Sequence, residues 1–152
     1  MDYSHNGLSI KMSSRILNEL GDHYDTEGKY ETGGILLGHF GHDFIEITEV
    51  YQLKSSLLSK FQYRRSVKKA QKLIDKRWKE TNGVVNYLGE WHTHPNMSSV
   101  PSSADKCMLS KILLLVGNKI PGVVVIVLGK DKEMTMMIGK ENKIYAFLLN
   151  RL

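Results

Sequence analysis

The sequence predicts an α+β fold in which helices flank a mixed β-sheet. Segments with strand-like and helix-like patterns are interspersed along the chain, turn residues join several strands as hairpins, and one late segment is apolar throughout. A chain of 152 residues with 41% hydrophobic residues can bury a core of its own. We therefore expect a single domain that spans residues 1–152.

The first third of the chain predicts one helix and one hairpin. Apolar residues at helical spacing indicate a helix that begins at Ser13 or Ser14 and ends at Gly21. Two aliphatic segments, residues 32–38 and 44–50, predict strands, and the turn residues between them predict a hairpin. Residues 53–60 show no clean period and are expected to form a loop.

A second, amphipathic helix is predicted over residues 67–78. Its inward-facing residues are expected to be Ala70, Leu73, Ile74 and Trp78. The chain has 21 Lys and Arg against 16 Asp and Glu, and much of the excess lies in residues 64–79. We interpret this basic segment as a solvated helix face, with an acidic partner or nucleic acid as the alternative. No phosphate-binding glycine loop accompanies it, so nucleic acid is not the expected partner.

The second half of the chain alternates strands with one long helix. A strand is expected over residues 84–91, and two prolines bracket a loop over residues 96–101. Ser102 can cap a helix over residues 103–116. Three further segments predict strands: residues 123–128, 134–138 and 144–149.

The composition excludes several classes of protein. The longest apolar segments are too short to cross a bilayer, and the first residues lack the features of a signal peptide. A single cysteine, Cys107, excludes an internal disulfide and a cysteine-rich zinc module, and we expect its thiol to be buried. A cytoplasmic protein without membrane association is therefore expected.

Two histidines, a serine and an aspartate lie close together between positions 92 and 105. His92 and His94 are alternate residues at the end of a predicted strand, so their side chains point the same way. Asp105 lies on the first turn of the next helix, which the intervening loop can fold back over the strand end. Two histidines and one carboxylate are the pattern of a catalytic zinc site, which keeps its fourth position for water. The sequence therefore predicts a hydrolase.

Amide hydrolysis also requires a residue that moves protons, because the leaving nitrogen must be protonated. Glu31 precedes a Gly-Gly strand, in which missing side chains allow other backbone to come close. Glu90 precedes His92 by two residues and faces the same side of the strand; without a catalytic role, it is expected to be solvated or ion-paired. The chemistry alone does not separate the two glutamates.

The order and spacing of these residues resemble the JAMM motif of the JAB/MPN metalloproteases. His92-Thr93-His94, seven residues, Ser102, two residues and Asp105 match the pattern H-x-H-x7-S-x2-D. Residues 31–38, with the sequence ETGGILLG, are similar to the family's first motif segment, which contains its catalytic glutamate. The resemblance extends from Glu31 to the strand near residue 128.

The resemblance implies a role for each matched residue. Three would bind Zn²⁺: His92, His94 and Asp105. Glu31 would act as general base and then as general acid, which favours it over Glu90, and Ser102 would hydrogen-bond the oxyanion of the intermediate. An MPN/JAB-like fold, related to that of cytidine deaminases, is also implied. No motif position departs from the pattern of active members.

The compact length is typical of bacterial members of the family. Among these, the chain most resembles the JAB peptidases of CBASS antiviral operons. Those enzymes release a partner protein that a ubiquitin-activating-like enzyme has attached through its C-terminus. The resemblance implies a deconjugating protease that cuts a peptide or isopeptide bond after an extended C-terminal tail of a ubiquitin-like or otherwise conjugated protein. Two alternatives remain: an amidase for a small molecule or a sulfur-carrier protein, and a module that binds ubiquitin-like folds without catalysis.

Overall fold

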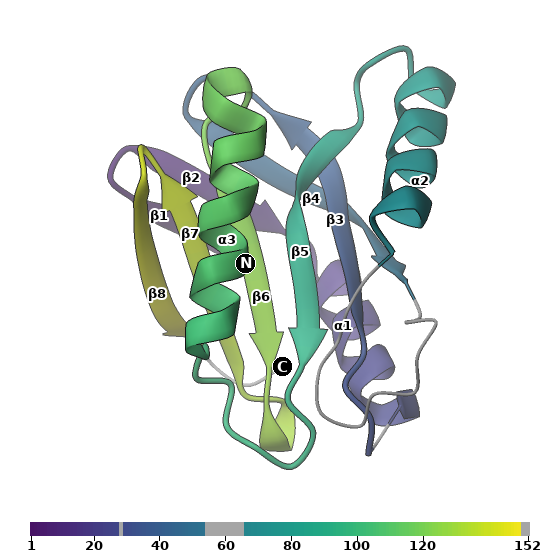
Figure 1. The fold of residues 1–152 in the computed structure, drawn as a ribbon, viewed down its shortest axis with the longest axis vertical. Helices are drawn as coiled ribbons and strands as arrows, with labels where there is room; N and C mark the ends of the chain where they lie inside the picture. Colours follow the sequence, from purple (N-terminus) through teal and green to yellow (C-terminus); the bar gives the residue numbers. More distant parts are fainter. Residues whose placement is uncertain (28, 54–65, 150–152) are drawn as a thin grey trace.

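The computed structural model describes residues 1–27, 29–53 and 66–149, in which one mixed sheet of eight strands packs against three α-helices. The α-helices are α1 (Ser14–Glu27), α2 (Val67–Glu80) and α3 (Ser103–Val116). The strands are β1 (Asp2–His5), β2 (Leu8–Met12), β3 (Gly33–Phe40), β4 (Phe44–Gln52), β5 (Asn86–Thr93), β6 (Val123–Leu128), β7 (Met134–Lys140) and β8 (Lys143–Leu149). The predicted α+β class with a mixed sheet is confirmed (Figure 1).

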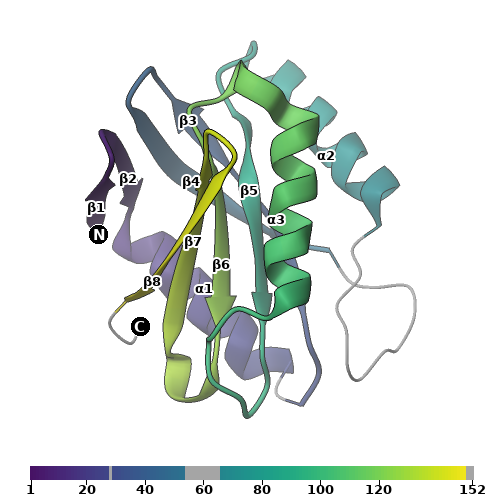
Figure 2. The ribbon, with the colours of Figure 1, turned by 60° about the vertical axis from the view of Figure 1, so that its left-hand side comes forward.

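The strands follow the order β1-β2-β4-β3-β5-β6-β7-β8, and only the β2–β4 and β5–β6 pairs are parallel. Helices α2 and α3 cover one face of the sheet, and α1 covers the other (Figures 1 and 2). The sheet curves enough for side chains of its two edge strands to meet, with the rings of Tyr3 and Phe147 4.7 Å apart. None of the helices in the described part of the chain is long and apolar enough to span a membrane.

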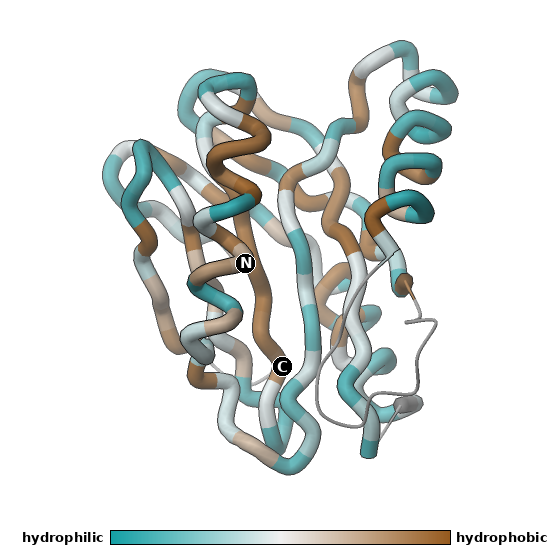
Figure 3. Tube along the Cα trace, viewed as in Figure 1, coloured by the Kyte–Doolittle hydropathy of each residue, from teal (hydrophilic) through white to brown (hydrophobic). Residues whose placement is uncertain are grey.

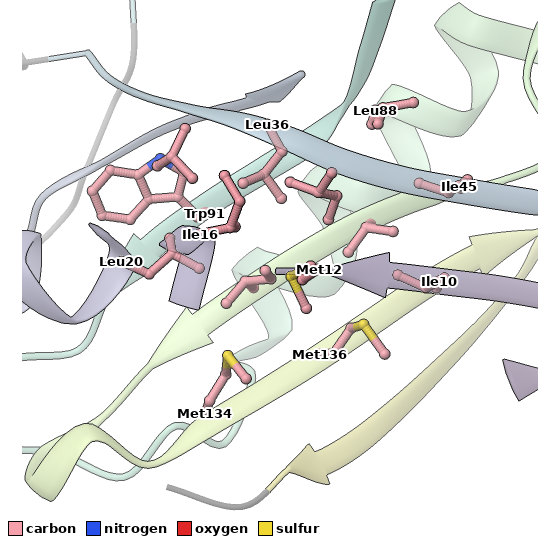
Figure 4. Close-up of a cluster of buried hydrophobic side chains, with 14 of the residues drawn as sticks. Ile10, Met12, Ile16, Leu20, Leu36, Ile45, Leu88, Trp91, Met134 and Met136 are labelled. Atoms are coloured by element: carbon pink, nitrogen blue, oxygen red, sulfur yellow. The ribbon is translucent and has the colours of Figure 1, made fainter. Parts of the chain in front are cut away.

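Strand β6 is apolar along its whole length because both of its faces are covered (Figure 3). Its even-numbered residues pack into a cluster with Ile16 and Leu20 of α1 (Figure 4). Its odd-numbered residues pack into a second cluster with Leu109 and Ile112 of α3. A third cluster joins α2 to β3 through residues that include Ala70 and Ile35.

A β-bulge in β5 decides which of its side chains enter the core. The pairing with β3 moves from Leu37↔Tyr87 to Leu36↔Gly89, which leaves one extra residue on β5. After this bulge Trp91 points into the α1 cluster, where it is fully buried. Alternation then places the side chain of His92 on the opposite face, toward α2 and α3.

The structure extends the first predicted helix and adds a hairpin that was not predicted. Helix α1 does not end at Gly21, because Tyr24 continues the apolar stripe and packs on the same core as Leu20. Strands β1 and β2 were missed, although Asn6-Gly7 is a strong hairpin signal: both residues have positive φ, 49° and 71°.

The predictions about two individual side chains, Trp78 and Cys107, were wrong. Trp78 is 53% exposed, because it lies in the last turn of α2 and covers the Gly83 turn instead of the sheet. Cys107 is exposed, since it lies on the solvent side of α3 while Leu109 faces the sheet. For Glu90 only the solvated alternative is wrong: the residue is 1% exposed, and its carboxylate accepts a hydrogen bond from Tyr87 Oη at 3.1 Å.

The lysines of α2 are solvent-exposed, which both interpretations of the basic segment require. Arg77 is the exception: its guanidinium donates to Glu49 Oε1 at 2.6 Å and to Oε2 at 2.9 Å, which ties α2 to β4. The hydrogen bond from Arg77 is the main reason that the pKa of Glu49 lies below its usual value. The predicted loop 53–60 lies outside the described residues apart from Leu53, and so do Arg64 and Arg65.

We predict that Gly34→Ala destabilises the protein strongly. A Cβ at Gly34 would lie 1.7 Å from the carbonyl oxygen of Tyr51, so β3 and β4 would have to separate. Urea unfolding should show a loss of about 3 kcal/mol. Gly7→Ala is the matched control, because a Cβ added there would meet nothing within 4 Å and only a backbone cost of about 1 kcal/mol is expected. Equal losses in the two variants would contradict the packing account.

Candidate active site

Three side chains converge where β5 ends and α3 begins. His92 Nε2 lies 3.2 Å from His94 Nε2 and 3.0 Å from Asp105 Oδ1, and His94 Nε2 lies 3.6 Å from Asp105 Oδ2. All three residues are largely buried. The structure therefore brings the three predicted ligands together as a group that can hold a metal ion.

The strand pairing fixes the two histidines. His92 lies between Gly33 of β3 and Val127 of β6, so backbone on both sides holds it. The backbone N–H of His94 donates to the carbonyl of Leu128 at 2.7 Å, which keeps the residue in line with β5 after the strand ends. Both imidazoles consequently point to the same side, as their alternate positions predicted.

Asp105 is oriented by its second role as part of a helix cap. The backbone N–H and the hydroxyl of Ser102 donate to its Oδ2 at 2.6 and 2.7 Å, while its own N–H donates to Ser102 Oγ at 3.2 Å. This capping box begins α3 and confirms Ser102 as the N-cap. Because the cap holds Oδ2, Oδ1 is the oxygen that faces His92.

The charges of the site stabilise an ionised carboxylate between two imidazoles. Burial by itself would raise the pKa of Asp105, but hydrogen bonds with His92, His94 and Ser102 outweigh it and hold that pKa far below its usual range. The hydrogen bond with Asp105 raises the pKa of His94, although burial opposes this. A fixed negative charge among polarisable nitrogens is an environment that favours a cation.

A backbone carbonyl that the sequence did not predict fixes the orientation of the His94 ring. Its Nδ1 lies 3.2 Å from the carbonyl oxygen of Ser98, which can only accept, so Nδ1 carries the proton. In the neutral ring this leaves the lone pair on Nε2, the nitrogen that faces Asp105. No residue type in the sequence signals this contact, because it depends on the path of the loop backbone.

The donor set fits a tetrahedral zinc ion. Ligands at bond lengths of about 2.0–2.2 Å from Zn²⁺ are about 3.3–3.6 Å from one another in a tetrahedron. His92 Nε2 lies 3.2 Å from His94 Nε2 and 3.0 Å from Asp105 Oδ1, close to that range, and the ligand atoms of the three residues lie within 4.8 Å of one another. Two imidazoles and one carboxylate also match the ligands of catalytic zinc sites and leave a position for water.

Glu31 lies across from His94, just before β3 begins and just after β5 ends. Gly33 pairs with His92, and the N–H of Thr93 continues this pairing by donating to the carbonyl of Thr32 at 2.8 Å. One step further along the two antiparallel chains, Glu31 faces His94. The pKa of His94 is raised first by the hydrogen bond with Asp105, then by the hydrogen bond with Ser98 and the charge of Asp105, and the negative charge of Glu31 adds the smallest of these contributions. This position supports its predicted role in proton transfer.

Glu90, the second candidate for proton transfer, lies deeper in the sheet. It pairs with the apolar residues Ile35 and Val125, and its carboxylate accepts a hydrogen bond from Tyr87. A carboxylate enclosed in this way is remote from the open end of β5, where a substrate would reach His94. The geometry therefore favours Glu31 over Glu90.

The sequence of this chain matches a family and several named relatives. The model of the prokaryotic homologues of the JAB domain matches residues 13–140. A protein of Enterobacter hormaechei named CD-NTase/cGAS isopeptidase is 31% identical over 128 residues, which cover 81% of this chain and 68% of that protein. Proteins of the same name occur in Pseudomonas aeruginosa, with 33% identity and coverage of 64% and 62%, and in Escherichia coli, with 30% identity and coverage of 74% and 69%.

The fold also matches a solved structure. The solution structure of a protein from Desulfitobacterium hafniense superposes with a TM-score of 0.64 and covers 94% of this chain and 92% of its own. The two sequences are 18% identical, so this likeness supports the fold alone. The family match, in contrast, covers the helices and strands that build the three-donor group. The chain therefore belongs to the family of prokaryotic JAB-domain homologues.

Proposed function

We propose that this chain is a zinc-dependent protease that releases a protein conjugated through its C-terminal tail, and that residues 1–152 act as a single domain. The convergence of His92, His94 and Asp105 is the observation that carries the proposal, because three ligands leave room for chemistry at the metal. The names of the relatives suggest the substrate class: a CD-NTase-like protein held in an isopeptide bond. A role in antiviral defence is part of the proposal.

His92, His94 and Asp105 would hold the ion. A zinc ion in such a site polarises a carbonyl and lowers the pKa of a coordinated water to about 7. Glu31, which faces His94 from the neighbouring chain segment, would take a proton from the attacking water and then give it to the leaving nitrogen. The scissile amide would bind at the open end of β5, with the extended tail added beside an exposed strand edge.

Ser102 would stabilise the oxyanion with its hydroxyl. This hydroxyl donates to Asp105 Oδ2 at 2.7 Å, but the backbone N–H of Ser102 reaches the same oxygen at 2.6 Å. The hydroxyl can therefore turn toward the substrate while the N–H continues to hold the carboxylate. One residue would serve both the helix cap and the transition state.

We predict that zinc stabilises the protein through the histidine pair. At a free zinc concentration 100 times the Kd, wild type should gain about 2.7 kcal/mol in the free energy of unfolding. His92→Ala should lose most of this gain, because it removes one of three ligands. His42→Ala is the matched control: His42 is exposed in the β3–β4 turn and should leave the zinc response intact. An unchanged response in His92→Ala would place the metal elsewhere.

We predict that replacing Glu31 by glutamine slows cleavage, whereas replacing Glu90 by glutamine does not. Glu31→Gln should lower the cleavage rate about 10²- to 10⁴-fold, because glutamine cannot transfer the proton, while zinc binding is retained. Glu90→Gln should cleave at nearly the wild-type rate, since the amide can still accept from Tyr87. Initial rates on one conjugate, with zinc content measured in parallel, check this. The reverse order of activities would overturn the assignment of Glu31.

We predict that the zinc-loaded protein cuts a tailed conjugate directly after the last residue of the tail. A CD-NTase joined to a carrier through a lysine isopeptide bond is the substrate, and mass spectrometry of the products locates the cut. A short acyl-amide is the comparison. Faster turnover of the small amide would favour an amidase, and binding of the conjugate without cleavage would favour a non-catalytic module.

A further inference from the structure

A cluster of polar side chains joins the loop between His94 and α3 to the start of β7. Ser99, the fifth residue after His94, is fully buried, and it contacts Glu133 and Thr135 at the start of β7. None of these three residues belongs to the motif that predicts the metal site. Ser99 and Thr135 are buried and Glu133 is half-buried. The two buried hydroxyls require a structural reason, because buried polar groups are costly unless they are paired.

The hydrogen bonds of this cluster run in one direction. The backbone N–H of Ser99 donates to Glu133 Oε2 at 2.8 Å, and the Ser99 hydroxyl lies 3.0 Å from the same oxygen. An amide N–H can only donate, and the hydroxyl donates to the same carboxylate oxygen, so Ser99 is the donor in both. Thr135 Oγ1, 2.7 Å from Ser99 Oγ, must then donate to Ser99. Glu133 is thus the final acceptor of a chain of hydrogen bonds that fixes Ser99.

Backbone contacts attach the same loop to the turn after β6. The N–H of Lys130 donates to the carbonyl of Met97 at 2.6 Å, and the N–H of Gly129 donates to the carbonyl of Glu133 at 2.8 Å. A Cβ at Gly129 would lie 2.2 Å from the backbone nitrogen of Ser99, so the two segments are in direct contact. The loop after His94 is therefore packed against the segment that contains Glu133.

The cluster reaches the metal site through one peptide group. Ser98, whose carbonyl accepts from His94 Nδ1 at 3.2 Å, is bonded directly to Ser99. We propose that Glu133 is a positioning residue for the metal site: by holding Ser99 it places the Ser98 carbonyl, and this carbonyl orients the His94 ring. The proposal rests on the proposed metal-binding function. It gives Glu133 a role as an acceptor, not as a charge near the ion.

Zinc affinity distinguishes a role of Glu133 as a hydrogen-bond acceptor from a role as a charge near the ion. Glu133→Ala leaves the Ser99 N–H and hydroxyl without their acceptor, and we expect it to weaken zinc binding about 10- to 100-fold. Glu133→Gln keeps an acceptor oxygen and removes the charge, so it should recover most of the affinity. Ser99→Ala removes only the hydroxyl and should show a smaller loss. Chelator competition measures the affinity, and the visible spectrum of the Co²⁺-loaded protein reports the geometry of the ligands.

The matched control is Glu141→Ala, which makes the same change in the turn between β7 and β8, where the side chain is 79% exposed. It should bind zinc like wild type. Wild-type zinc affinity and cobalt spectrum in folded Glu133→Ala, or in Ser99→Ala should Glu133→Ala not fold, would overturn the proposal. Equal losses in Glu133→Ala and Glu133→Gln would also overturn it, in favour of a charge effect. Absence of zinc binding by wild type would instead refute the metal site itself.

Discussion

The carboxylate of Asp105 is the group on which the arrangement of the site depends. One of its oxygens closes the N-terminal cap of α3, and the other faces the imidazole of His92. The same side chain therefore begins a helix and completes a ligand set, so helix formation and site formation are coupled. An ionised carboxylate at a helix N-terminus is favourable in itself, and this helps to keep it charged beside the two imidazoles.

The sheet supplies the rigidity that this carboxylate needs. Strand β5 is paired on both sides, and the clusters under α1 and α3 fix it from both faces. The bulge at Leu88 sets the alternation, so that Trp91 enters the core and His92 enters the site. A site on a paired central strand moves less than one on a loop, which suits a metal centre whose ligands must stay within a few tenths of an ångström.

The sequence was sufficient for the fold class and for the convergence of the histidines with Asp105, because strand alternation and the Ser102 cap are local rules. The β1–β2 hairpin was not predicted, although the Asn6-Gly7 pair is typical of a hairpin turn. The exposure of Cys107 could not be predicted from the sequence, because it depends on how α3 is rotated about its axis against the sheet. The Ser98 carbonyl that orients His94 was not accessible either, since backbone groups are the same in every residue and only the loop path places them. Local patterns therefore predicted the elements, whereas tertiary packing decided the supporting contacts.

The coordination of zinc in the loaded protein is the most direct test of the proposed metal site. X-ray absorption at the zinc K-edge counts the imidazole ligands and separates nitrogen and oxygen from sulfur by bond length. We expect two imidazoles with oxygen as the remaining ligands, all at about 2.0–2.2 Å from the zinc ion. A sulfur ligand at about 2.3 Å, or a number of imidazoles other than two, would contradict a site made by His92, His94 and Asp105.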